Sequence, residues 1–122
     1  MDGILQVENF DTSLAEGLML LTPFAADATD DLTVNFVKSY KDAYNEVPVQ
    51  FAADAYDAIY AIKAAMEDAG VTSDMDASAI CDALKTSMLN IKLDGLTGEG
   101  MTWTEDGELI RHLRLLRLWT EL

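Results

Sequence analysis

The sequence predicts an α/β fold that is rich in helix and has short strands and a C-terminal hairpin. Three observations support this fold class. The segments 29–47 and 48–69 carry apolar residues at helical spacing between capping residues and prolines. The apolar run 17–22 is short and ends at a proline, which is typical of a strand. The dipeptide Asp106-Gly107 favours a two-residue turn, so a hairpin is expected around it.

The first expected element is a core strand over residues 17–22. Its run, Gly-Leu-Met-Leu-Leu-Thr, is continuously apolar rather than alternating. Such runs are typical of strands that are buried on both faces. Pro23 then stops the ladder because it has no backbone N–H to donate.

The first helix is expected to begin at Thr29-Asp30-Asp31 and to end before Pro48. The three polar residues supply an N-cap and two first-turn carboxylates, which the positive end of a helix favours. Its large apolar residues recur every four positions, as Leu32, Phe36, Tyr40 and Tyr44. This spacing predicts that they form one apolar stripe.

Two further helices are expected before residue 90. The second restarts at Pro48 and ends before Gly70, a suitable C-terminal glycine, and its stripe consists of Ala55, Ile59, Ile62 and Met66. Asp76 can cap the third helix, and Lys85 lies late in it, where the helix dipole favours a cation. The apolar residues of the third helix are Ile80, Ala83, Leu84 and Met88.

Composition changes abruptly at Glu108. Short extended pieces are expected at 95–98 and 101–104, and a further strand should follow the Asp-Gly turn. Residues 109–122 instead contain all three arginines, the only histidine and six leucines. One interpretation is an amphipathic helix, with leucines such as Leu113, Leu116 and Leu118 on one face and the arginines on another.

Charge and residue counts exclude several classes of function. The net charge of −14 argues against nucleic acid as a partner and against attraction to an anionic membrane. No run of about 18 apolar residues is present, and the first residues do not form an export signal. The single cysteine, Cys81, and the single histidine, His112, provide neither an internal disulfide nor a multi-thiolate metal site. No cofactor is therefore expected.

No acidic cluster indicates a metal site or a catalytic pair. Asp27, Asp30 and Asp31 lack the spacing and the glycine of a calcium loop, and Asp76 next to Asp74 is better explained as a helix cap. Cys81 lies beside apolar residues of the third helix and is expected to be a small buried hydrophobe. We therefore expect a protein that is not an enzyme; a carboxylate-based hydrolase has only the acidity in its favour.

Four segments, taken in chain order, resemble one known family. They are Glu16–Phe24, the F-x-x-x-Y segment Phe36–Tyr40, Val49–Met66 after Tyr44-Asn45-Glu46-Val47-Pro48, and Leu93–Gly98 with Trp103–Glu108. Together they resemble the C-terminal part of the branched-chain amino-acid-binding family. These are the leucine/isoleucine/valine-binding, type I periplasmic solute-binding proteins of ABC importers.

The resemblance implies a two-lobe fold of which this chain would hold the last third. Residues 1–108 would be a partial solute-binding region, with residues up to about Thr22 in the second lobe and 24 to about 100 in the first. It also implies a truncated extracytoplasmic protein whose intact form delivers an amino acid to a membrane ABC permease. Phe51 matches the position of an aromatic that faces the ligand in this family. The alternative for Phe51 is a core aromatic that anchors the start of the helix.

Residues 109–122 depart from the family, whose members continue with a Lys/Pro-containing stretch and a β-branched strand. We hypothesise that this tail is read in a shifted frame. An alternative function for the whole chain is a small acidic helical interaction protein that docks through the apolar stripes of its first two helices, without a role in transport. Self-association would be a simpler result of the same exposed stripes.

Overall fold

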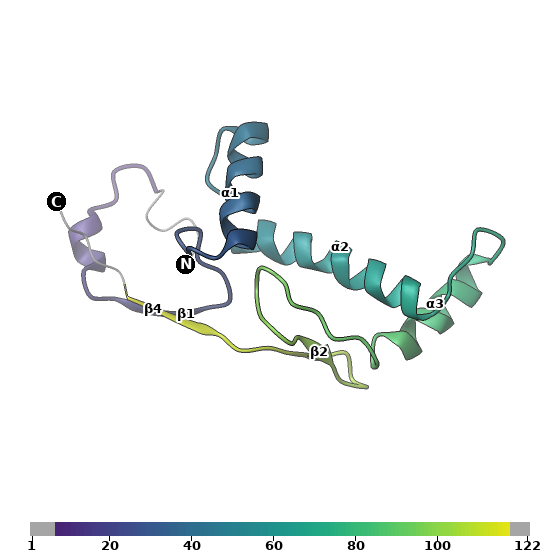
Figure 1. Cartoon of the computed structure of the whole chain (residues 1–122). Helices are drawn as coiled ribbons and strands as arrows, with labels where there is room; N and C mark the ends of the chain where they lie inside the picture. Colours follow the sequence, from purple (N-terminus) through teal and green to yellow (C-terminus); the bar gives the residue numbers. More distant parts are fainter. Residues whose placement is uncertain (1–6, 118–122) are drawn as a thin grey trace. The chain divides into compact units, whose positions relative to one another are not determined.

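The computed structural model of the chain describes residues 7–117 (Figure 1). These residues belong to two compact units, which are the described parts of Met1–Ala53 with Leu113–Leu122, and Asp54–His112. We call them the first unit and the second unit. Their helices and strands are β1 (Met19–Thr22), α1 (Asp31–Tyr44), α2 (Gln50–Asp68), α3 (Ala77–Ser87), β2 (Thr102–Trp103), β3 (Leu109–Ile110) and β4 (Arg114–Arg117). This set confirms the predicted helix-rich α/β class with short strands.

In the first unit, β1 pairs with β4 in an antiparallel ladder that runs from Met19 opposite Arg117 to Thr22 opposite Arg114. The prediction of a buried core strand is wrong. Met19 and Leu21 are exposed, and of the three β1 side chains that the structure describes only Thr22, at the end of the strand, is buried. The reason is that the ladder has two strands, and a two-stranded ribbon does not provide a covered interior by itself.

The N-cap of helix α1 lies one residue later than predicted. It is Asp30 rather than Thr29, and its carboxylate accepts a hydrogen bond from the Thr33 N–H at 3.0 Å. The helix ends at Asn45, which adopts a left-handed conformation with φ of 55°. Its buried residues are Thr33 and Val37, beside the predicted stripe. Two members of that stripe, Leu32 and Tyr44, are exposed.

Helix α2 has the predicted extent but not the predicted buried face. Its large apolar residues are exposed, including Phe51, Ile59, Ile62 and Met66. Its buried residues are Ala53, Asp57, Ala61 and Ala65, which recur every four positions. Small side chains let neighbouring backbone come close, so this face is covered by short-range packing while the bulky face lies open.

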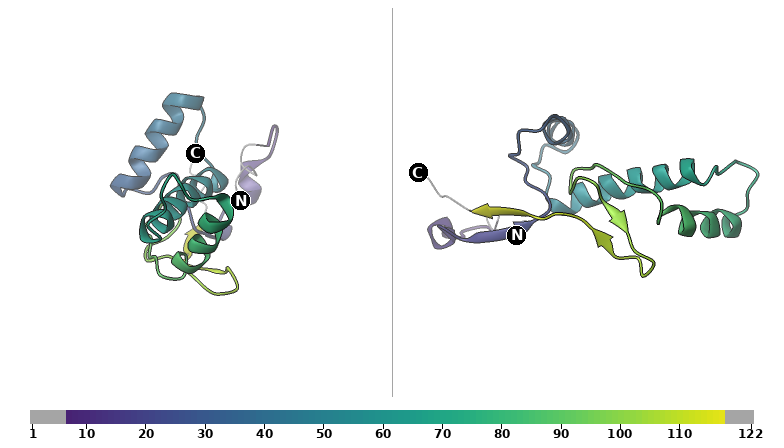
Figure 2. Two further views of the ribbon diagram at one scale, coloured as in Figure 1. Left: turned by 90° about the vertical axis from the view of Figure 1, so that its right-hand side faces the viewer. Right: turned by 60° about the horizontal axis from the view of Figure 1, so that its bottom comes forward.

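The core of the second unit lies between α2 and the segments that follow it (Figure 2). Ala61, Ala65 and Ile91 are buried together, and the partly buried side chains packed on them include Leu84, Met88, Leu93 and Trp103. Asp76 caps α3 as predicted, because its carboxylate accepts a hydrogen bond from the Ala79 N–H at 2.8 Å. Lys85 lies in the last turn of α3, also as predicted.

A hairpin follows the core segments. β2 pairs with β3, with Thr102 opposite Ile110, and its turn contains Gly107 at φ of 82°. A strand therefore follows the Asp-Gly pair as predicted, but the predicted two-residue turn is wrong. The Gly107 N–H donates to the Thr104 carbonyl at 2.9 Å and the Thr104 N–H to the Glu108 carbonyl at 3.0 Å, so three residues form the turn. The alternative of an amphipathic helix over the tail is wrong up to residue 117, because β3 and β4 lie there. Residues 118–122, including Leu118, lie outside the described residues.

Candidate functional site

The predicted ligand-facing residue, Phe51, lies in the first turn of α2, in the first unit. Its side chain is 73% exposed. Pro48, three residues earlier, is buried. Phe51 is therefore not the core aromatic of the alternative interpretation. The structure presents its ring at a helix start, where another molecule or another part of a larger fold can cover it.

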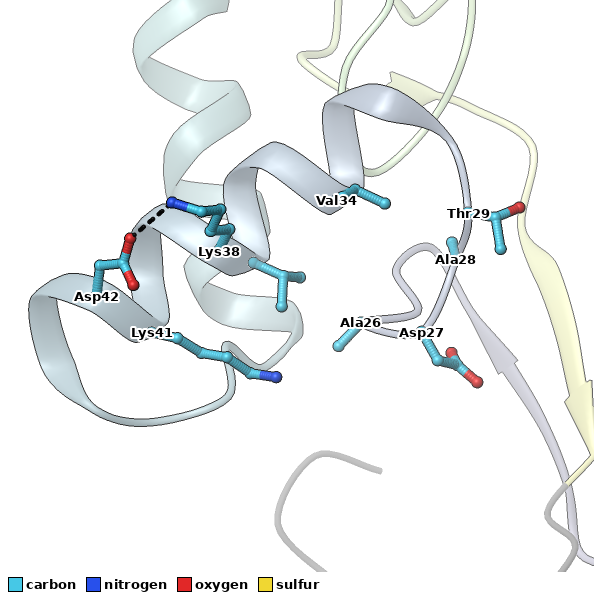
Figure 3. A pocket seen from close by; sticks show the side chains of 9 residues that line it. Ala26, Asp27, Ala28, Thr29, Val34, Lys38, Lys41 and Asp42 are labelled. Atoms are coloured by element: carbon cyan, nitrogen blue, oxygen red, sulfur yellow. Dashed lines mark hydrogen bonds and ion pairs between the residues drawn. The ribbon is translucent and has the colours of Figure 1, made fainter.

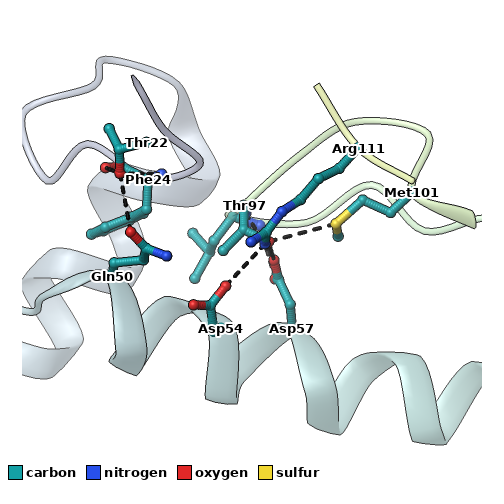
Figure 4. Close-up of polar contacts among 9 residues, drawn as sticks. Thr22, Phe24, Gln50, Asp54, Asp57, Thr97, Met101 and Arg111 are labelled. Carbon is teal, nitrogen blue, oxygen red and sulfur yellow. Dashed lines mark hydrogen bonds and ion pairs between the residues drawn. The ribbon is translucent and has the colours of Figure 1, made fainter. Parts of the chain in front are cut away.

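Polar contacts hold Gln50, the residue before Phe51, against the end of β1 (Figure 4). The buried Thr22 hydroxyl lies 3.3 Å from the Gln50 side-chain oxygen and 3.1 Å from the Phe24 carbonyl oxygen. Phe24 is also buried, and its ring meets Phe36 of α1 edge-on, with 6.0 Å between the ring centroids. Thr22 thus joins the end of β1 to the start of α2, and Phe24 packs the following residues against α1.

The start of α2 differs from the starts of α1 and α3. Those two helices are capped by Asp30 and Asp76, whereas α2 follows Val49, whose side chain has no acceptor. The Val49 carbonyl accepts from the Ala52 N–H at 3.0 Å, and no acid lies in the first turn. The first turn of this helix therefore contains no side-chain carboxylate at its positive end.

A second polar cluster, in the second unit, was not predicted. The carboxylate of Asp57, a residue only 6% exposed, accepts hydrogen bonds from the Leu96 N–H at 2.8 Å, the Thr97 N–H at 2.8 Å and the Thr97 hydroxyl at 2.7 Å. Arg111 donates from Nη1 to Thr97 Oγ1 at 2.9 Å and to Asp54 Oδ1 at 3.0 Å. This cluster ties the 95–98 loop and the end of β3 to α2.

A cavity of about 320 Å³ lies beside this cluster. Its apolar walls include Met88, Met101 and Trp103, and its polar lining consists of the four residues that bond to one another, Asp54, Asp57, Thr97 and Arg111. The volume is at the lower end of small-molecule sites. Because its polar groups already bond to one another, we interpret the cluster as a structural contact between α2, the 95–98 loop and Arg111 rather than as a ligand site.

A more open cavity of about 490 Å³ lies along α1 in the first unit (Figure 3). Lys38 and Lys41 border it on the helix, and Asp27 borders it on the preceding loop. Lys38 pairs with Asp42 at 3.0 Å, and both side chains are largely exposed. Exposed pairs of this kind contribute little energy, so this cavity has the character of ordinary surface.

Within the described chain, none of the other residues singled out from the sequence belongs to either polar cluster. Asp30 and Asp76 are helix caps, and no group of three or more metal-ligating side chains occurs within residues 7–117. Hydrogen bonding from the Thr72 side chain lowers the pKa of the Asp74 carboxyl. The expectation that Cys81 is buried is wrong, because it lies on the exposed side of α3. His112 is exposed as well.

Sequence reasoning missed Asp57, Thr97 and Arg111. A signal was available for Asp57, because it occupies the same four-residue spacing as Ala53, Ala61 and Ala65. This spacing places Asp57 on the same helix face as the three buried alanines. Arg111 carried no such signal, since its partner Asp54 lies 57 positions away.

Within the described residues, no helix combines the length and the apolar character that crossing a membrane requires. Comparison with known proteins gives a consistent result. Residues 6–120 match the family model of periplasmic binding proteins. No curated protein matches the sequence significantly.

Three solved structures are similar to the chain. One is a protein from Rhodospirillum rubrum, provisionally described as a branched-chain amino acid ABC transporter, with 29% identity, a TM-score of 0.67 and coverage of 87% of this chain and 29% of that one. A leucine-binding protein, LivK, from Thermotoga maritima has 24% identity, a TM-score of 0.61 and coverage of 87% and 29%. An ABC transporter substrate-binding protein from Desulfitobacterium hafniense has 22% identity, a TM-score of 0.63 and coverage of 85% and 32%. The last two show the shared fold, and the chain spans less than a third of the length of all three.

Proposed function

Because the chain belongs to the periplasmic binding protein family, we propose that it forms part of an extracytoplasmic solute-binding protein whose complete form carries a branched-chain-like amino acid to a membrane ABC permease. The likeness to the Rhodospirillum rubrum protein supports this choice of solute. The observation that carries the proposal is the exposed ring of Phe51 at the start of α2.

The chemistry of an amino-acid site explains what this chain would contribute. A zwitterion needs donors for its carboxylate, an acid for its ammonium and an apolar wall for its side chain, and each charge-assisted hydrogen bond contributes about 1.5 to 3 kcal/mol. Phe51 would form part of the wall. The other groups would come from the parts of the complete protein that this chain does not span. The chain by itself is therefore expected to bind weakly or not at all.

Isothermal titration of this chain with leucine, isoleucine and valine is the first test. We expect no measurable heat, because the wall without its polar partners lacks most of the binding energy. Binding at millimolar concentration or tighter would contradict the proposal that the cleft is incomplete.

The second test restores the missing parts. Residues 7–108 would replace the corresponding segment of the Rhodospirillum rubrum protein, and leucine binding to the chimera would be titrated. Phe51→Ala should weaken binding about tenfold or more, since burial of an aromatic side chain contributes roughly 1.5 to 3 kcal/mol. Tyr44→Ala, which removes another exposed aromatic, is the matched control and should leave affinity unchanged. A folded chimera that does not bind leucine, or equal effects of the two substitutions, would contradict the proposal.

A second candidate function is docking onto a partner protein through the bulky face of α2. The observation in its favour is the exposure of Ile59, Ile62 and Met66 along one helix. Sedimentation of the purified chain tests it together with Ile59→Ser/Ile62→Ser. A clean monomer that melts sharply and is unaffected by the double substitution would oppose this candidate.

We also propose that residues 109–122 are encoded in a displaced reading frame. The support is the abrupt change at Glu108 to a segment with three arginines and six leucines. The nucleotide sequence of the gene tests this origin. The displaced frame should encode a Lys/Pro-containing stretch followed by a β-branched strand, and a frame without such a strand would contradict it.

A further inference from the structure

The chain passes between its two units twice. It enters the second unit at Asp54, within α2, and leaves it after His112. Asp54 is thus the first residue of the second unit, and Arg111 is the residue before its last. These two side chains form an ion pair, with 3.0 Å between Arg111 Nη1 and Asp54 Oδ1. The two passages are therefore tied together at the point where they meet the second unit.

The Arg111 side chain is held by a hydrogen bond to Thr97 in addition to its ion pair with Asp54. Its Nη1 also donates to the Thr97 hydroxyl at 2.9 Å, and that hydroxyl donates to Asp57 at 2.7 Å. Thr97 and Asp57 are buried, so this support is fixed within the second unit. A Cβ on Gly98 would lie 3.1 Å from the Arg111 Cβ, which shows how closely the two segments approach. The rigid planar guanidinium can serve several acceptors at once, which an ammonium does less well.

The other ion pairs in the described residues are of a different kind. Lys38–Asp42, Lys63–Glu67 and Lys85–Asp82 each join residues three or four positions apart within one helix. Their side chains are between 61% and 75% exposed, whereas those of Arg111 and Asp54 are 20% and 34% exposed. Of these four ion pairs, the Arg111 pair is the one that joins segments distant in the sequence.

We propose that Arg111 is a positioning residue that holds the two passages together, so that they act as one connection rather than as two independent tethers. The inference rests on the proposed function in one respect. In a carrier whose two units reorient around a solute, the Arg111–Asp54 pair would limit the range of that reorientation. The proposed role belongs to Arg111 in this chain and requires no solute to be observed.

The test measures the spread of distances between the two units. Cys81, the only cysteine, is exposed in the second unit, and Ser39→Cys adds a site on the exposed side of α1 in the first. Spin labels at both sites give a distance distribution by pulsed dipolar spectroscopy. We expect Arg111→Met to widen this distribution at least twofold. Asp54→Asn should widen it less, because Arg111 keeps Thr97, and the double variant should match Arg111→Met.

A matched control is Lys63→Met. It removes a cation and its ion pair with Glu67 from α2, the helix that carries Asp54, and it leaves both passages unchanged. It should leave the distribution unchanged. Circular dichroism and Trp103 fluorescence show whether each variant is folded. If Arg111→Met does not fold, Arg111→Lys replaces it, because it keeps the charge but loses the rigid fork, and its distribution should still be wider than that of the parent.

Equal widths for the parent and a folded Arg111 variant would overturn the proposal, as would the same widening in Lys63→Met. Lower thermal stability without widening would identify Arg111 as a residue that only stabilises the second unit, and would also overturn it. The outcome is separate from the carrier role. A chimera that fails to bind leucine would remove the carrier role and leave a widened distribution in Arg111→Met as evidence for the connection.

Discussion

Helix α2 presents two faces that differ in side-chain size and in burial. On one face Ala65 is 1% exposed and Asp57 is 6% exposed, whereas on the other Phe51 is 73% exposed and Ile59 is 67% exposed. The small face packs against the rest of the described chain, and the bulky face has no comparable cover there. On this helix the large apolar side chains therefore lie on the open face, whereas alanines and one aspartate form the buried face. Four predictions test this difference, in order of expected effect.

The largest effect is expected where the small face carries its one charge. Asp57→Ala should lower the free energy of unfolding by about 3 kcal/mol or more, because it leaves the buried Leu96 and Thr97 N–H groups without their acceptor. Urea unfolding followed by Trp103 fluorescence, in a Trp119→Phe background, measures it. Asp68→Asn removes an exposed acid from the same helix and should change stability by no more than about 0.5 kcal/mol. Similar losses for both would show that the two faces do not differ.

A smaller loss is expected where the 95–98 loop approaches the small face. A Cβ on Gly95 would lie 2.5 Å from Asp57 Oδ1, and that carboxylate cannot move without breaking its hydrogen bonds. Gly95→Ala should therefore destabilise the chain by about 1 to 3 kcal/mol. Gly98→Ala is the matched variant, with its nearest atoms at 3.1 Å, and should cost less. Thermal melting of both variants measures the order, and the reverse order would contradict the close approach.

The third prediction concerns Tyr56, beside the small face. A hydrogen bond with Tyr60, together with burial, raises the pKa of Tyr56 from 10.0 to about 12. Below pH 10 both the folded and unfolded states keep this proton; between pH 10 and 12 only the unfolded state loses it, so the contribution of Tyr56 to stability falls as pH rises. Tyrosinate absorbance should show one group that ionises near pH 12 and is missing in Tyr56→Phe. Identical titrations of the parent and this variant would refute the shift.

The smallest effect is expected on the bulky face. Ile59→Ser should change the free energy of unfolding by no more than about 0.5 kcal/mol, because the side chain is already in water and the two residues have similar helix propensities. Ala65→Ser places a hydroxyl on the buried face instead and should cost about 1 to 3 kcal/mol. Urea unfolding of the pair compares them. If Ile59→Ser cost more, the bulky face would already be covered in the isolated chain.

The sequence was sufficient to predict where the helices lie and where the hairpin turns, although not the length of that turn. Caps, prolines and glycines act within a few residues, so Asp76 and Gly107 indicate their roles without knowledge of the fold. The buried faces were not predictable in the same way. The stripe of Ile59, Ile62 and Met66 predicts a buried face only if a partner surface is present, and the described residues do not supply one.

The candidate site was only partly accessible from sequence. Phe51 was predicted as a ligand-facing residue through the likeness of its segment to a family, and in this structure its side chain is exposed. Spacing could have indicated Asp57 as a residue of the buried face, but not its partners Thr97 and Arg111, because the cluster joins segments up to 57 positions apart. For the tail, an amphipathic helix was one interpretation of its leucines and arginines. Residues 114–117 pair with β1 instead, since a ladder can override weak local preference.

The ladder between β1 and β4 has a consequence for how the molecule assembles. Thr22 and Arg114 stand opposite each other although about ninety residues separate them, so closing this pair costs more chain entropy than any helix turn. We expect it to form late, after the three helices and the β2–β3 hairpin. During that interval β4 of one molecule can add to β1 of another, and the chain would then exchange its last strand in a swapped dimer at high concentration.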